Sequence, residues 1–176
     1  MAIKFNSVVR GLAIVAACGL FGAGQAEAAF NSANLSVSAS VGASCSISTS
    51  ALAFGAYDPV VANSSTALDG TGGVIVTCTN GASTTVTLGQ GSNANTGSTD
   101  AAPLRRMRDG ATSNYLSYTI FQDSGHNTAW GNTTPTGLAY TGTGSSTTLS
   151  VYGRVAAAQN VPAGTYTDVV VATITF

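Results

Sequence analysis

The chain has 176 residues, of which only 7% are charged, and its net charge at neutral pH is −1. An ordinary soluble domain has about 25% charged residues, so ion pairs cannot dominate this surface. The few basic side chains exclude the broad positive face that nucleic-acid binding requires. Ser, Thr, Gly and Asn make up most of the polar residues, whereas the helix formers Gln, Glu, Lys and Met are scarce. This composition predicts an all-β protein of the extracellular type.

The N-terminal 28 residues have the pattern of a signal peptide. Lys4 and Arg10 are followed by an apolar stretch at 11–22, and Ala26–Ala28 has the small-x-small cleavage pattern. The apolar stretch is shorter than the roughly 20 residues of a membrane span. We therefore expect cleavage after Ala28, export through the periplasm, and no membrane span in the mature chain.

An alternative processing signal lies at residues 15–18. The sequence Val-Ala-Ala-Cys resembles the bacterial lipobox, which would place a lipid on Cys18. Apolar residues continue past Cys18, and a good cleavage site follows at Ala28. These two features favour the ordinary signal peptide.

The mature chain retains two cysteines, Cys45 and Cys78, and has no lysine. An even number of cysteines in an exported chain predicts a disulfide between them. The absence of lysine excludes Lys–Asn isopeptide cross-links after cleavage.

Alternation of apolar and polar residues is the dominant pattern of the mature chain. It predicts one long strand over 35–47. Further strands are expected at 73–78, 84–88, 104–108, 115–122, 147–155 and 166–176, with a loop at 89–100 and irregular chain at 125–144. Short strands at this spacing, together with one disulfide, predict an immunoglobulin-like β-sandwich over 43–176, preceded by an N-terminal segment at 29–42.

The residues that could carry chemistry are isolated from one another. His126 is the only histidine and is expected to be a solvated loop residue, so it cannot build a multi-histidine metal site. No G-x-S-x-G motif surrounds any serine. The aspartates lie near turns or strand ends, where they bond their own backbone: Asp58, Asp69, Asp100, Asp109, Asp123 and Asp168. We therefore predict a protein that is not an enzyme and that needs no metal or cofactor.

Two clusters suggest a binding module as the alternative function. Arg105, Arg106 and Arg108 form the one basic cluster, which we interpret as a solvated strand face. Trp130 and Tyr140 could stack against sugars, or cover one end of the sandwich. A secreted, monomeric carbohydrate-binding sandwich would be stable and soluble when expressed alone.

The two ends of the mature chain favour assembly instead. The apolar face of 35–41 has no turn that would fold it back into its own sheet, and a free strand of this kind aggregates unless another chain receives it. The last strand ends at Phe176 with no strand after it, so the sandwich would lack one strand and have an open groove. Addition of a strand from a neighbouring chain would close it. The expected donor residues are Leu35, Val37, Ala39 and Val41, and the expected acceptor edge contains Tyr166, Val170, Ala172, Ile174 and Phe176.

The same residues carry a resemblance to the spore coat protein U family, and to the pilins of archaic chaperone–usher pili. The matching motifs are the alternating segment before 42–47, Phe54–Gly55 with Tyr57, and the stretches 73–78, 118–123 and 162–168 that lead to an aromatic end. The resemblance implies an incomplete sandwich held by a periplasmic chaperone that donates a strand and anchors the C-terminal carboxylate. It further implies that the outer-membrane usher exchanges this strand for the N-terminal strand of an identical or related subunit. The product would be a cell-surface pilus that supports adhesion and biofilm formation.

Overall fold

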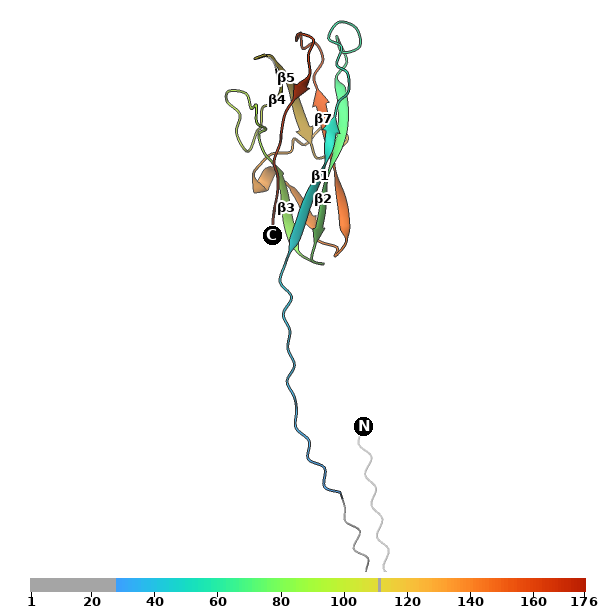
Figure 1. Ribbon diagram of the computed structural model, residues 1–176, viewed down its shortest axis with the longest axis vertical. Coiled ribbons are helices and arrows are strands. Elements are labelled where there is room, and N and C mark those ends of the chain that lie inside the picture. The colour runs from blue at the N-terminus through green and yellow to red at the C-terminus, as the bar shows by residue number, and fades with distance from the viewer. Residues whose placement is uncertain (1–27, 111) are drawn as a thin grey trace, which may run out of the picture. The chain divides into compact units, whose positions relative to one another are not determined.

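The computed structural model describes residues 28–110 and 112–176 (Figure 1), so residues 1–27 of the expected signal peptide, Cys18 among them, lie outside the described residues. The regular structure in these residues is β apart from one 3-10 turn, η1 (Thr134–Thr136), which confirms the all-β prediction. The strands are β1 (Cys45–Ala53), β2 (Leu68–Cys78), β3 (Ser83–Leu88), β4 (Arg105–Asp109), β5 (Tyr115–Phe121), β6 (Leu138–Thr141), β7 (Ser146–Val155), β8 (Tyr166–Thr167) and β9 (Ala172–Thr175).

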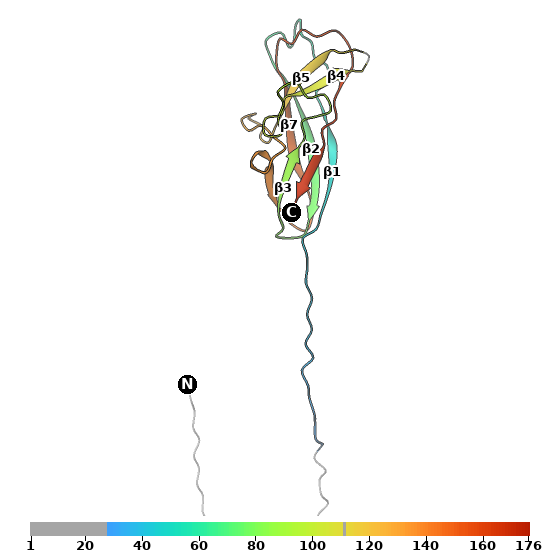
Figure 2. The same cartoon turned by 90° about the vertical axis from the view of Figure 1, so that its left-hand side faces the viewer.

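The chain divides into a unit that ends at Ala39 and a domain from Ser40 to Phe176. The strands of the domain form two antiparallel sheets (Figure 1, Figure 2). The larger sheet has the order β1-β2-β7-β5-β4-β8, and the smaller one has the order β6-β3-β9. In this arrangement β1 lies at one edge of the larger sheet, β8 lies at its other edge, and β9 lies at an edge of the smaller sheet.

Apolar side chains from both sheets form one core. The larger sheet contributes from β2, β5 and β7, and the smaller sheet contributes from β3. Each buried large apolar side chain stabilises the fold by about 1.5–3 kcal/mol relative to exposure. The buried members are Val74, Val76, Val86, Leu88, Leu116, Tyr118, Ile120, Trp130, Val151 and Val155.

Glycines in the larger sheet make room for two side chains from the end of β1. A Cβ on Gly153 would lie 2.7 Å from Phe54 Cζ and 2.8 Å from Leu52 Cδ2. A Cβ on Gly70 would lie 2.9 Å from Phe54 Cδ1. The pairing of β1 with β2 also shifts register between Ser50 and Ala53. Leu52 and Phe54 therefore contact the sheet at positions where a side chain larger than that of glycine would collide with them.

Three expected strands differ from those observed. Residues 35–44 carry no strand, because none of the described strands pairs with them; the backbone of Ser44 bonds only to Thr79, which lies just after β2. β2 begins at Leu68 rather than Gly73. The glycines at 70, 72 and 73 lie within the strand, where neighbouring atoms leave no room for a side chain, and do not form a loop. The terminal strand is split into β8 and β9, because the chain passes from one sheet to the other. In the stretch expected to be irregular, the four-residue strand β6 pairs only with β3.

Candidate functional site

The candidate site is a groove between β1 and the C-terminal segment 166–175. β1 pairs only with β2, β8 only with β4, and β9 only with β3 among the described strands. The domain therefore presents two strand edges that have no partner of their own. Residues of β1 and of the C-terminal segment line the same cavity, so these two edges lie on either side of one opening.

The C-terminal segment is hydrogen-bonded along one edge throughout its length. After β8, the Ser92 N–H donates to the Val169 carbonyl at 3.0 Å and the Gly89 N–H donates to the Val171 carbonyl at 2.9 Å. β9 then pairs with β3. One edge of the segment is thus satisfied by the domain, and its opposite edge is left for an additional strand.

The inward side chains of this segment are four of the five residues expected on the acceptor edge. Tyr166, Val170, Ala172 and Ile174 are half-buried and pack against the core. Val169 and Val171 alternate with them, and each is 67% exposed. Phe176, the fifth expected residue, is 57% exposed.

Two cavities lie along the groove. One, of about 390 Å³, lies between the β1 residues Thr49–Leu52 and the C-terminal residues 166–172. The other, of about 740 Å³, continues between residues 52–60 and 160–164. Apolar side chains of the core, including Leu116 and Val155 in the larger cavity and Val74 and Leu88 in the smaller one, form their floors. The groove is therefore an open part of the hydrophobic core.

A buried polar contact fixes the point at which the C-terminal segment changes sheets. The Tyr118 hydroxyl donates to Asp168 Oδ2 at 2.7 Å, and the backbone N–H and the side-chain amide of Asn93 donate to Asp168 Oδ1 at 3.2 and 3.0 Å. Burial, followed by the hydrogen bond to Asp168, raises the pKa of Tyr118, so the hydroxyl stays protonated at neutral pH. This contact holds the acceptor segment against β5.

The loops around the larger cavity are also tied to one another. The Tyr57 hydroxyl donates to the Ala156 carbonyl and accepts from the Gln159 N–H, both at 2.9 Å. The Gln159 side-chain amide pairs with the N–H and C=O of Ser117 at 2.8 and 2.9 Å, as a neighbouring strand would. The Ala158 N–H donates to the Asn63 carbonyl at 2.9 Å. This end of the groove is therefore preformed in the subunit.

The expected donor residues lie in a segment without regular structure. Residues 28–44 are exposed and contain neither helix nor strand. Leu35 is 87% exposed, Val37 is 85% and Val41 is 86%, and Ala39 is also exposed. Three large apolar side chains on one alternating face thus have no cover within the described chain.

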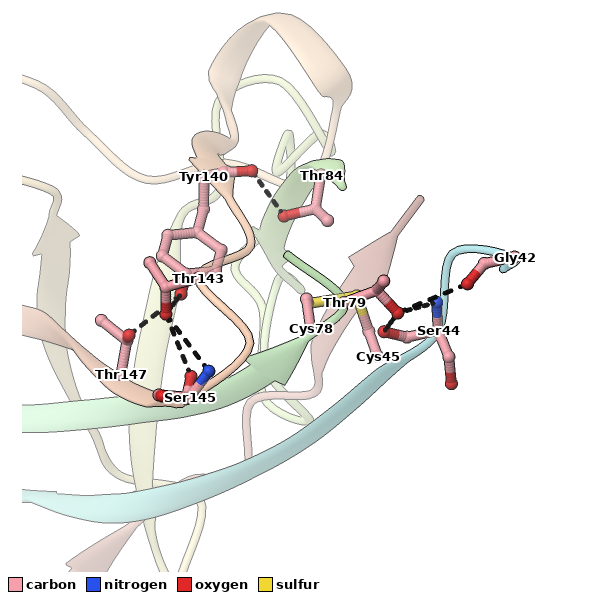
Figure 3. Close-up of a disulfide and its surroundings, with 10 residues drawn as sticks. All are labelled: Gly42, Ser44, Cys45, Cys78, Thr79, Thr84, Tyr140, Thr143, Ser145 and Thr147. Atoms are coloured by element: carbon pink, nitrogen blue, oxygen red, sulfur yellow. Dashed lines mark hydrogen bonds between the residues drawn. A yellow bond between two sulfur atoms is a disulfide. The ribbon is translucent and has the colours of Figure 1, made fainter. Parts of the chain in front are cut away.

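The predicted disulfide is confirmed, and it stands at the start of β1. Cys45 and Cys78 are bonded and lie directly opposite each other in the β1–β2 pairing (Figure 3). Beside them, the Thr79 N–H donates to the Ser44 carbonyl at 2.9 Å, and the Thr79 hydroxyl accepts from the Ser44 N–H at 3.1 Å. The point at which the N-terminal segment joins the domain is therefore fixed by a covalent bond and by Thr79.

The expectation that the arginine cluster forms a solvated strand face is wrong for Arg105. Arg105 is 1% exposed and lies in the core, so the arginine cluster is not a solvated face as a whole. Arg106 and Arg108 point to the opposite side of β4, where Arg106 lies 4.0 Å from the Tyr115 ring centre. Alternation along β4 places Arg105 and Met107 on the inner face, and this signal was present in the sequence.

Trp130 is 0% exposed, and its indole N–H donates to the Val86 carbonyl at 2.9 Å, so it cannot stack against a sugar. Tyr140 is half-buried in β6, and its hydroxyl donates to Thr147 at 2.9 Å. The two aromatic residues of the carbohydrate-binding alternative thus belong to the structure of the sandwich. Figure 3 shows Tyr140 near the disulfide.

His126 is also less exposed than predicted. Its side chain is 9% exposed and lies between the rings of Phe121 and Tyr152. Its Nε2 atom is 3.7 Å from Asp69 Oδ1 and makes no hydrogen bond. Within residues 28–110 and 112–176, no cluster of three or more His, Cys, Asp or Glu side chains could hold a metal ion. No helix in this part of the chain is long and apolar enough to cross a membrane.

Comparisons with known proteins agree with this architecture. The family model of the Spore Coat Protein U domain matches residues 31–173. Protein U of Myxococcus xanthus is 51% identical over 170 residues, which cover 93% of this chain and 95% of that protein. Among solved structures, the CsuC–CsuE chaperone–tip adhesion subunit pre-assembly complex, from archaic chaperone–usher Csu pili of Acinetobacter baumannii, matches with a TM-score of 0.54.

That structural match has 21% sequence identity and covers 77% of this chain, but this chain spans only 40% of the matched one. It shows a shared fold. The family model and the full-length relative cover most of the chain at higher similarity. The chain belongs to the Spore Coat Protein U domain family.

Proposed function

We propose that this protein is a structural subunit that polymerises by strand donation. Residues 29–42 of one copy enter the groove between β1 and segment 166–175 of the next copy and add the missing strand. The observation that carries this proposal is the apolar groove itself, which is open between two unpaired strand edges. The product is a fibre on the cell surface, which supports adhesion and biofilm formation.

The energetics favour such an exchange. Leu35, Val37 and Val41 are each at least 85% exposed, and burial of each would favour assembly by about 1.5–3 kcal/mol before ordering costs. The serines at 36, 38 and 40 lie on the opposite face of an extended strand and can remain in water. Backbone hydrogen bonds to the free edges supply the remaining affinity.

A subunit with this open groove needs cover before it assembles. A periplasmic chaperone that donates a strand would protect the groove, and an outer-membrane usher would catalyse the exchange. The solved structure with the same fold is a chaperone–subunit complex from a chaperone–usher pilus, which supports this route for the present chain.

The family relationship supports a second candidate, a subunit of a protein coat. The matching family takes its name from a spore coat protein. The relative from Myxococcus xanthus is 51% identical over 95% of its own length. Strand donation would build either a fibre or a coat. Electron microscopy of native cells and spores with a labelled antibody distinguishes filaments from a coat layer.

The test of strand donation compares two substitutions in the donor segment of the full chain. Val37→Asp places a charge where an apolar side chain must enter a neighbour's groove, at a cost of several kcal/mol. Ser38→Asp adds the same charge on the opposite face. We expect Val37→Asp to fold and to be captured by the chaperone but not to polymerise, whereas Ser38→Asp polymerises. Polymerisation of Val37→Asp at the native level would refute strand donation by this segment.

A further inference from the structure

The two cavities of the groove meet at a boundary where four side chains belong to the lining of both. Leu52, Phe54, Met107 and Tyr166 line both cavities, and we call these four side chains the waist. Leu52 and Phe54 come from the end of β1 on one side, whereas Met107 in β4 and Tyr166 in β8 come from the other side. All four are half-buried and pack against the core. A strand that fills both cavities must pass between them.

Three of the waist side chains are held in place by their own contacts. Phe54 lies edge-on to Tyr118 with ring centres 5.8 Å apart, above Gly153. Leu52 also lies over Gly153. The Tyr166 hydroxyl donates to the Pro162 carbonyl at 2.8 Å. Met107 is unbranched and is the waist side chain that can adapt most easily. Because three of the four side chains are held by these contacts, the waist can adapt less to a large donor side chain than to a small one.

We propose that Ala39 of the donating copy is the residue that passes the waist, so that it sets the register of strand donation. This inference rests on the proposed strand donation and adds the alignment of the two chains. Side chains on one face of a strand are about 6.6 Å apart along it, so the waist residue must have one larger apolar neighbour two positions away on each side. Val37 and Val41 are these neighbours, and they enter the two cavities.

The other alanines on the same face, Ala29, Ala33 and Ala43, do not satisfy this pattern, and Ala29 lies two residues before the polar Asn31. Ala33 has Asn31 on one side, which would carry a polar amide into an apolar cavity. Ala43 is followed two residues later by Cys45, which is disulfide-bonded in its own domain and cannot enter another. The pattern at Ala39 is the same read from either end, so the assignment holds whichever way the donor strand runs.

The experiment uses matched alanine-to-leucine substitutions in the full chain, co-expressed with its chaperone. We expect Ala39→Leu to slow polymerisation by about tenfold or more, because a leucine overfills the waist. Ala33→Leu, the same change on the same face, should polymerise at close to the native rate. Combining Ala39→Leu with Met107→Ala should restore most of the rate, because each copy then also offers a wider waist; Met107→Val replaces Met107→Ala if the latter fails to fold.

The outcomes separate the register from strand donation itself. Native polymerisation of Ala39→Leu, or a block that a smaller residue at Met107 does not relieve, overturns the assignment of Ala39. Equal blocks by Ala33→Leu and Ala39→Leu overturn it as well. Val37→Asp serves as the reference in the same assay: if it is blocked while Ala39→Leu assembles normally, only the register is wrong. If Val37→Asp also assembles normally, the proposed function fails.

Discussion

The guanidinium of Arg105 donates to the carbonyl of Trp130 at 2.8 Å inside the core. The same side chain donates to the carbonyls of Leu88 and Gly89 at 2.7 and 2.8 Å. Burial lowers the pKa of Arg105 to about 10, so the group remains charged at neutral pH. Arg105 thus supplies hydrogen-bond donors to three carbonyl groups, two at the end of β3 and one at Trp130.

Replacement of Arg105 by methionine removes these donors and leaves the carbonyls without partners. We expect Arg105→Met to lower the free energy of unfolding by about 3 kcal/mol or more, because each buried carbonyl left without a donor costs about 1–3 kcal/mol. Arg108→Met is the control, since Arg108 is exposed and should change the value by less than about 0.5 kcal/mol. Urea denaturation of both variants measures the difference. Equal stability of the two variants would contradict a structural role for the buried arginine.

The ion pair between Asp69 and Arg154 predicts a dependence on pH. The two residues lie opposite each other on β2 and β7, and both guanidinium bonds to the carboxylate are 2.6–2.7 Å long. The hydrogen bond from Arg154 holds the pKa of Asp69 below its ordinary value of 3.8. A carboxylate whose pKa is lowered by folding stabilises the folded state above its unfolded pKa, and this contribution is lost as the pH falls through the folded pKa.

Asp69→Asn should therefore be less stable than the native chain at pH 7, and the difference should shrink as the pH falls below 3.8. The effect is small, because the pair is partly exposed. Arg154→Gln should show the same pattern. The measurement is the urea midpoint of each chain at pH 7 and at pH 2.5. A difference that is undiminished in acid would show that Asp69 acts through packing instead of charge.

The disulfide should contribute substantially to stability. Cys45 and Cys78 are 33 positions apart in sequence. In the chain-entropy model, a loop of this size restricts the unfolded chain enough to stabilise the fold by about 3–4 kcal/mol. We expect replacement of both cysteines by alanine to lower the free energy of unfolding by this amount. Reduction of the native protein should give the same loss, and an unchanged midpoint after reduction would contradict it.

The C-terminal end should control capture by a chaperone. Phe176 is exposed directly after β9, and the proposed chaperone contact includes a carboxylate on this residue. A four-residue Gly-Ser tail after Phe176 moves this charge away from the end of the strand. We expect tailed chains to co-purify with the chaperone far less than native chains. The same insertion after Gly97, in an exposed loop, is the control. Equal recovery of the tailed and native chains would contradict anchoring by the carboxylate.

Local patterns in the sequence predicted the disulfide and most of the central strands, because alternation and cysteine number are read directly from the sequence. They did not predict the burial of Trp130, whose partner Val86 is distant in sequence. Alternation along 105–108 indicates an inner face for Arg105, but its carbonyl partners come from distant segments and could not be predicted. Local patterns also did not predict the start of β2 at Leu68. The glycines there are explained by the close approach of Leu52 and Phe54, which only the folded structure shows. The outer edges of the groove follow from the sequence pattern, but its two cavities depend on tertiary packing.

The bond between Cys45 and Cys78 has a mechanical consequence. Tension along a fibre would reach each subunit through the residues that precede Cys45, and the first cross-strand pair it meets is Cys45 with Cys78. Hydrogen bonds at the end of a strand ladder would break there one at a time. The covalent bond instead transfers the load to β2, an 11-residue strand that lies between β1 and β7. A pulled subunit would therefore stretch against the interior of its larger sheet rather than lose its edge strand.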